Sequence, residues 1–60
     1  MDIENLVSIK EIARRLGVSL YTVYYWAAAG RIPHYRIGRN LRFSWPEVEE
    51  WLRKHRREVA

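Results

Sequence analysis

The stretch that decides the fold runs from Ser8 to Gly30 and reads SIKEIARRLGVSLYTVYYWAAAG. Its apolar residues recur three or four positions apart, which places them on one face of a helix. Gly17 interrupts the pattern where a chain leaving a helix favours positive φ. The stretch therefore predicts two short helices, over residues 8–16 and 20–29, joined by a turn of about three residues.

The residues at the helix ends support this pairing. Ser8 and Glu11 have the spacing of a capping box, in which the Ser8 hydroxyl accepts from the Glu11 amide and the Glu11 carboxylate reaches back to the Ser8 amide. Ser19 is a second N-cap, and Gly30 is a C-cap for the second helix. The apolar residues expected between the helices are Ile9, Ile12, Ala13, Leu16, Val23 and Trp26. This joint pattern is that of a helix-turn-helix.

The spacing changes from helical to alternating after Pro33. Residues 34–43 predict two short strands around a turn at Gly38, Arg39 and Asn40, which together form a small hairpin or wing. Arg36, Arg39 and Arg42 are expected on the solvent face and at the tip of this hairpin.

A final helix is predicted from residue 44 to about residue 57. Residues 44–47, Ser-Trp-Pro-Glu, repeat the capping-box spacing with proline in the first turn. The inner face of this helix is expected to carry Val48, Trp51, Leu52 and His55. Basic residues at its end complement the helix dipole as readily as they bind phosphate, so they do not indicate a function by themselves.

The predicted fold is thus mainly α with a small β-hairpin: a helix-turn-helix, a two-stranded wing and a C-terminal helix. The 60 residues suit one domain, over residues 8–57, with an N-terminal arm at 1–7 and a tail at 58–60. Lysine and arginine number 11 against 7 acidic residues, which gives a net charge of +4 and favours a polyanionic partner.

Other classes of function find little support. The chain has no cysteine, and His34 and His55 do not have the spacing of metal ligands or of an activated nucleophile. We therefore expect no metal, no cofactor, no small-molecule substrate and no catalysis. No apolar run approaches the ~20 residues of a membrane span, and the acidic start is not a signal peptide, so a cytoplasmic, nucleoid-associated protein is expected.

The order of the motifs resembles the excisionase-like helix-turn-helix family, the small winged relatives of the MerR-type DNA-binding domain. The resemblance rests on residues 8–13, 16–19, 22–24, 26, 30–33, 36–38, 42–43, 48 and 51–52. It implies a prokaryotic or phage protein that binds double-stranded DNA and serves in DNA recombination or transcription regulation. It also implies that the second helix enters the major groove and that the wing lies on the adjacent minor groove or backbone.

Within this scheme the candidate DNA-binding residues are Ser19, Leu20, Tyr21, Thr22, Tyr24, Tyr25, Arg36, Arg39, Asn40 and Arg42, with Lys10, Arg14 and Arg31 as further phosphate contacts. The chain departs from the family in having no charged residue from Ser19 to Gly30, so an arginine fork on guanine is excluded there. Hydroxyl groups and apolar contacts with thymine methyls remain. Arg39 suits a narrow, A·T-rich minor groove.

Two alternatives stay open for the second helix. Leu20, Tyr21, Tyr24 and Tyr25 can form a surface that docks a recombinase, a terminase or a polymerase. Some of these tyrosines can instead simply cover the wing. Because one small domain has a short footprint on DNA, we also expect self-association on repeated sites or pairing with another protein.

Overall fold

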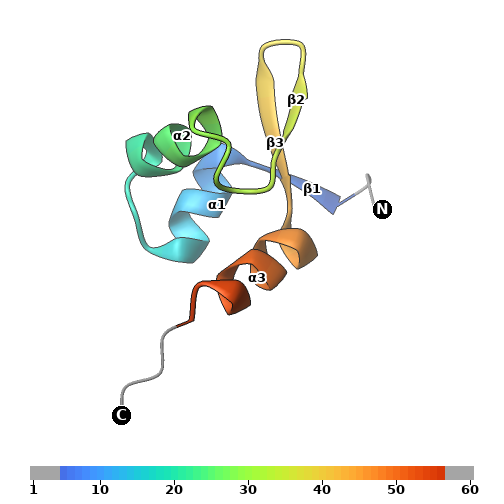
Figure 1. The fold of residues 1–60 in the computed structure, drawn as a ribbon. Helices are drawn as coiled ribbons and strands as arrows, with labels where there is room; N and C mark the ends of the chain where they lie inside the picture. Colours follow the sequence, from blue (N-terminus) through green and yellow to red (C-terminus); the bar gives the residue numbers. More distant parts are fainter. Residues whose placement is uncertain (1–4, 57–60) are drawn as a thin grey trace.

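The computed structural model describes residues 5–56 as three helices and a three-stranded antiparallel sheet (Figure 1). In chain order the elements are β1 (Leu6–Ser8), α1 (Ile9–Leu16), α2 (Leu20–Ala28), β2 (Tyr35–Ile37), β3 (Asn40–Ser44) and α3 (Trp45–Lys54). The architecture is a winged helix-turn-helix, as the sequence predicts.

The caps of the first two helices form largely as predicted. The Ser8 hydroxyl accepts from the Glu11 amide at 3.3 Å, and the Ser19 hydroxyl accepts from the Thr22 amide at 3.1 Å. Gly17 has φ 69° and ends α1, so that residues 17–19 form the turn. Helix α2 ends one residue earlier than predicted, and Gly30 follows its C-cap with φ 70°.

Two predicted side-chain contacts at helix starts are wrong. The Glu11 carboxylate accepts from Arg14 and Arg15 instead of turning back to the Ser8 amide. At the start of α3 the Ser44 side chain is buried and makes no capping hydrogen bond. Ser44 is the last residue of β3, and the Glu47 carboxylate is engaged elsewhere, by the Tyr35 hydroxyl at 2.6 Å.

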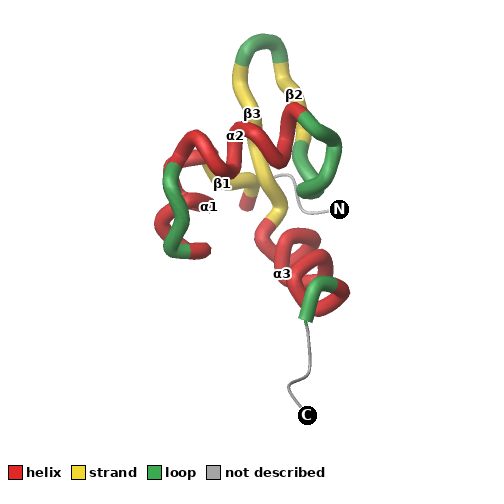
Figure 2. Tube along the Cα trace, turned by 60° about the vertical axis from the view of Figure 1, so that its left-hand side comes forward, coloured by secondary structure: helices red, strands yellow, loops and turns green. Residues whose placement is uncertain are grey.

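The sheet has one more strand than the sequence suggests. Strand β1 lies mostly in the stretch expected to be an N-terminal arm, and it pairs with β3, which is the central strand in the order β1-β3-β2. Val7 is the partner of Phe43 in this pairing. A strand of three residues directly before a helix is too short to show an alternating pattern, which explains why it was not predicted. Figure 2 shows β1 beside the base of the hairpin formed by β2 and β3.

The hairpin turn is tighter than predicted. Ile37 pairs with Asn40, so the loop contains only Gly38 and Arg39, and Asn40 is the first residue of β3. Gly38 has φ 62°, whereas Arg39 has no positive φ. Positive φ at the first of two central residues is the requirement of a type II′ turn, whose twist matches that of paired strands.

The core lies between the sheet and the helices. Its buried apolar residues are Ile12, Ala13, Val23, Ala27, Ile32, Leu41, Phe43 and Val48. Trp26 of α2 and Trp51 of α3 pack against this core and against each other, with ring centroids 5.6 Å apart. The predicted inner face of α3 is only half right, because Leu52 and His55 are exposed. Helix α3 ends at Lys54 rather than near residue 57, which lies outside the described residues.

Replacing Tyr35 by phenylalanine is expected to remove an alkaline component of stability. The Tyr35 hydroxyl donates to Glu47 and so joins the start of the hairpin to α3, and this hydrogen bond raises the pKa of Tyr35 above its ordinary value of 10. The stabilisation is therefore complete below about pH 10 and is lost as the pH rises through the folded-state pKa. In thermal melts from pH 8 to 11, the melting temperature of the wild type should fall at alkaline pH more than that of Tyr35→Phe. An identical alkaline loss in both proteins would contradict this role.

Candidate nucleic-acid interface

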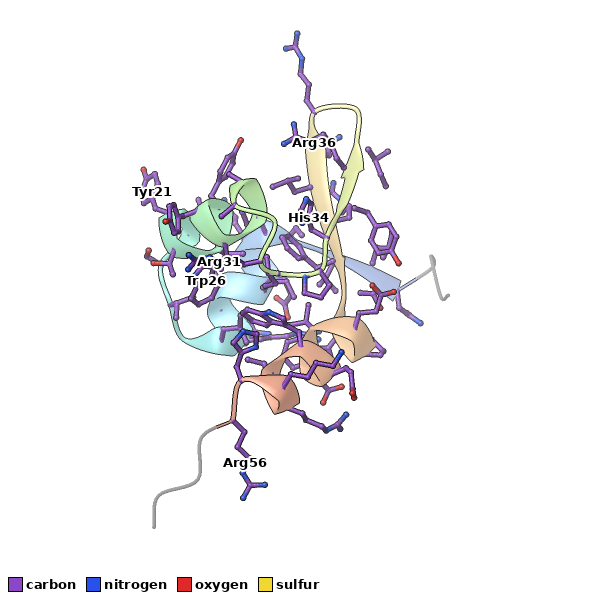
Figure 3. All side chains as sticks on the ribbon, in the orientation of Figure 1. Tyr21, Trp26, Arg31, His34, Arg36 and Arg56 are labelled. Atoms are coloured by element: carbon purple, nitrogen blue, oxygen red, sulfur yellow. The ribbon has the colours of Figure 1, made fainter. Side chains whose placement is uncertain are left out.

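Helix α2 exposes a neutral aromatic face, which we call the tyrosine surface: Tyr21, Tyr24, Tyr25 and Ala28. The three tyrosines are 83%, 56% and 61% exposed, and Ala28 is exposed beside them. Because these residues are three, four and seven positions apart, they project from the same side of the helix. The opposite side carries Val23 and Ala27 into the core. Figure 3 shows Tyr21 on the outer side of α2.

The start of α2 carries two of the predicted hydroxyl groups. The Ser19 and Thr22 hydroxyls lie 2.9 Å apart, and Ser19 also caps the helix. Both hydroxyls lie next to the positive end of the helix dipole, where an anion is stabilised. Leu20 was expected among the outward residues, but it is half-buried, which leaves the exposed face to the tyrosines.

The arginines of the hairpin divide between its two faces. Arg36 pairs with Leu41 across the strands, and residues paired in this way project from the same face of a sheet. Since Leu41 is buried in the core, Arg36 projects from the face on which the helices pack, and its own side chain is exposed. Arg39 and Asn40 are exposed at the tip of the hairpin.

Arg42 differs from what the sequence predicts. It pairs with Tyr35 and therefore lies on the face opposite to Arg36. It is half-buried, and its guanidinium donates to the Leu41 carbonyl at 2.8 Å. The expectation that Arg36 and Arg42 share the solvent face of the hairpin is thus wrong for Arg36. Alternation along β3 places Arg42 opposite to Leu41 and Phe43, on the face away from the core, whereas Arg36 lies on the core side.

Arg31 connects the tyrosine surface to a positive charge. Its guanidinium lies over the ring of Tyr25, 5.9 Å from the centroid. A cation at this distance is attracted by the face of the ring. The charge that α2 itself lacks is therefore supplied directly after its C-terminus.

Helix α1 holds two of its cations in an internal cluster. The Glu11 carboxylate accepts from the guanidinium of Arg14 at 2.5 Å and from that of Arg15 at 2.7 Å. These contacts, first with Arg14 and then with Arg15, lower the pKa of Glu11 from 4.5 to about 2 and raise the pKa of Arg14. Arg15 also lies over the Trp45 ring, 5.0 Å from its centroid. Lys10 is exposed on the same helix.

Replacing Glu11 by glutamine is expected to remove an acid-sensitive component of stability. Because the pKa of Glu11 is lowered in the folded state, its contribution is present above about pH 4.5 and is lost as the pH falls toward 2. Urea midpoints between pH 2 and 6 should therefore fall more steeply in the wild type than in Glu11→Gln. Glu50→Gln, which removes the carboxylate paired with Arg53 on α3, is the matched control. Equal slopes for the wild type and Glu11→Gln would contradict the assignment.

The described residues offer little to other kinds of site. Within residues 5–56 there is no group of three or more histidine, cysteine or acidic residues that could hold a metal ion. Over the same range, no helix is long and apolar enough to cross a membrane. His34 and His55 each bond a nearby backbone carbonyl, that of Ile32 and that of Trp51 respectively.

The structure therefore brings several of the predicted residues together and separates others. The tyrosines of α2, Arg31 and the exposed side of the hairpin lie on neighbouring elements. Helix α2 lies to the left of the hairpin in Figure 1 and passes in front of its lower part in Figure 2. Arg42 lies on the other hairpin face, and Arg14 is paired with Glu11. Ala28 was missed by sequence reasoning, although its position four residues after Tyr24 could have placed it on the same face.

The order of helices, the three-residue turn and the hairpin define a protein of the winged helix-turn-helix class. The model of a helix-turn-helix domain family matches residues 6–56, and the chain belongs to this family. The resemblance to the excisionase-like proteins is thereby confirmed, and such DNA-binding families are typically non-enzymatic. Comparisons with curated proteins and with solved structures found no match.

Proposed function

We propose that the protein binds double-stranded DNA with α2 in the major groove and the β2–β3 hairpin on the adjacent minor groove or backbone. One observation carries this proposal: the exposed face of α2 stands beside a hairpin that presents Arg36 and Arg39 on a helix-turn-helix scaffold. Major grooves admit a helix of this kind, and arginines favour phosphates and narrow minor grooves.

The distribution of charge supports the same partner. Residues 12–46 contain six arginines and no acidic residue. Arg31 and the Ser19 end of α2 add candidate phosphate contacts beside the tyrosine surface, and exposed Lys10 adds one on α1. Arg42 is assigned a smaller role, because its guanidinium is already bonded to a carbonyl.

Within this function, the protein serves as an excisionase-like architectural factor or as a small transcription regulator located on the nucleoid. A single domain of this size has a short footprint, so we propose self-association on adjacent sites or pairing with a recombinase or polymerase. Specificity from hydroxyls and tyrosines alone is modest, which makes an additional contact on the DNA useful.

A salt series of fluorescence anisotropy tests DNA binding itself. A labelled duplex is titrated with protein at several salt concentrations between about 50 and 300 mM. Over this range the neutralisation of about four to six phosphates gives a measurable fall in affinity. The logarithm of the affinity should then fall with the logarithm of salt with a slope of about −4 to −5. Absence of binding at the lowest salt concentration would overturn the proposal.

A protein-docking role for α2 is the second candidate, and the exposure of its three tyrosines favours it. Half-buried Leu20 contributes less to such a surface than the sequence suggests. The two functions differ in the substitution that matters. Loss of Arg39 should weaken DNA binding. Loss of Tyr21 with Tyr24 should leave DNA binding unchanged only if α2 docks a protein, and should weaken the binding of A·T duplexes if α2 lies in the major groove.

A further inference from the structure

We propose that the tyrosine surface reads the C5 methyl groups of thymine, so that the protein prefers A·T-rich duplexes. This inference rests on the proposed DNA binding and names the class of sequence that α2 accepts.

The exposed face of α2 has no means of reading guanine in the usual way. Guanine is read by arginine or lysine donating to O6 and N7, and α2 has no charged residue. Its exposed atoms belong to three phenol rings and to the methyl group of Ala28. The face is therefore largely apolar, with three hydroxyl groups at the ends of the rings.

The thymine methyl is the one apolar group that base edges present in the major groove. A tyrosine ring that covers a methyl removes apolar surface of both partners from water, which corresponds to roughly a fourfold gain in affinity for each methyl covered. Tyr21 and Tyr24 are free to make such contacts, because neither ring packs on another described aromatic ring or cation. A G·C pair offers these rings no methyl group, only polar groups and the smaller C5–H of cytosine.

The surroundings of this face favour a nucleic acid over a protein as its occupant. Arg31 lies over the Tyr25 ring at the C-terminal end of α2, and the hairpin adds exposed Arg36 and Arg39. Positive charge thus flanks an apolar face, which matches a groove that has methyl groups on its floor and phosphates along its walls. Arg39 at the hairpin tip is suited to the narrow minor groove of the same A·T-rich sequences.

The test compares three labelled duplexes of equal length at one salt concentration: alternating A·T, the same sequence with deoxyuridine in place of thymidine, and alternating G·C. The uridine duplex keeps every hydrogen-bonding group and the minor-groove edge of A·T, and lacks only the methyl groups. The wild type should bind A·T at least about fourfold more tightly than A·U, and G·C more weakly than A·T.

Two variants assign the effect to α2. Tyr21→Ala combined with Tyr24→Ala should abolish the preference for A·T over A·U, and circular dichroism should show that these exposed substitutions leave the fold intact. Arg36→Ala combined with Arg39→Ala should weaken binding to both duplexes and keep the ratio between them. The second variant thereby separates methyl recognition from general affinity.

Each of the other outcomes overturns the inference. Equal wild-type affinity for A·T and A·U would show that methyl groups are not read, while DNA binding itself would stand. A preference that survives in the tyrosine variant would place the recognition outside α2. If no duplex binds even at low salt, the proposed function fails together with the inference, and the tyrosine surface is then assigned to a protein partner.

Discussion

Replacing Phe43 by alanine is expected to remove most of the stability of the fold. Phe43 is fully buried at the centre of the sheet, opposite Val7 of β1, and it shares the core with residues of all three helices. Truncating a buried phenylalanine to alanine costs about 3–5 kcal/mol. A chain of this length has a free energy of unfolding of only about 3–9 kcal/mol.

Urea denaturation followed by circular dichroism measures this effect. Tyr21→Ala is the matched control, since it also truncates an aromatic residue but at a side chain that is 83% exposed. It should change the free energy of unfolding by no more than about 0.5 kcal/mol. A Phe43→Ala protein that unfolds at the same urea concentration as the wild type would contradict the described core.

Removing the two arginines on the tip and helix side of the hairpin should have the largest effect on DNA binding. If Arg36 and Arg39 each neutralise one phosphate, Arg36→Ala with Arg39→Ala should flatten the slope of log affinity against log salt by about 1.8. Between 1 M and 0.1 M salt the affinity of the wild type should therefore rise roughly 60-fold more than that of the double variant.

Arg42→Ala is the control for this pair, because Arg42 carries the same charge on the opposite face of the same hairpin. Its guanidinium donates to the Leu41 carbonyl, so its removal should change the salt slope less than the removal of either Arg36 or Arg39. Anisotropy titrations of the three proteins on one duplex provide the comparison. An effect of Arg42→Ala as large as that of the double variant would show that the hairpin binds through its other face.

Local signals account for the parts of the fold that could be predicted. Capping serines, Gly17 and apolar residues at helical spacing act within a few residues, so the sequence locates α1, α2 and the turn between them to within one residue. Gly38 likewise marks the hairpin turn, although its two-residue length depends on the register between β2 and β3.

The predictions that are wrong concern features set by contacts between distant parts of the chain. Glu47 has the spacing of a capping box with Ser44, but Tyr35, twelve residues earlier, takes its carboxylate. Strand β1 exists because the edge of β3 is open to pairing, which a sequence pattern of three residues does not reveal. Arg36 and Arg42 are separated by the sheet register, which alternation within each strand does not determine on its own.

In the candidate site too, some features could be predicted from the sequence and others depend on contacts in the folded protein. The absence of charge on α2 and the cations that follow it are visible in the sequence. The half-buried position of Leu20, the contact of Arg31 with Tyr25 and the pairing of Arg14 with Glu11 depend on packing and side-chain geometry.

Binding of DNA through α2 and the hairpin is tested by titrating the ¹⁵N-labelled protein with a short duplex and following its amide resonances. We expect the largest shifts in α2 from its Ser19 end, at Arg31 and along the hairpin around Arg36 and Arg39, while the amides of α3 change little. Shifts that gather at the basic end of α3, or a spectrum that the duplex leaves unchanged, would contradict this mode of binding.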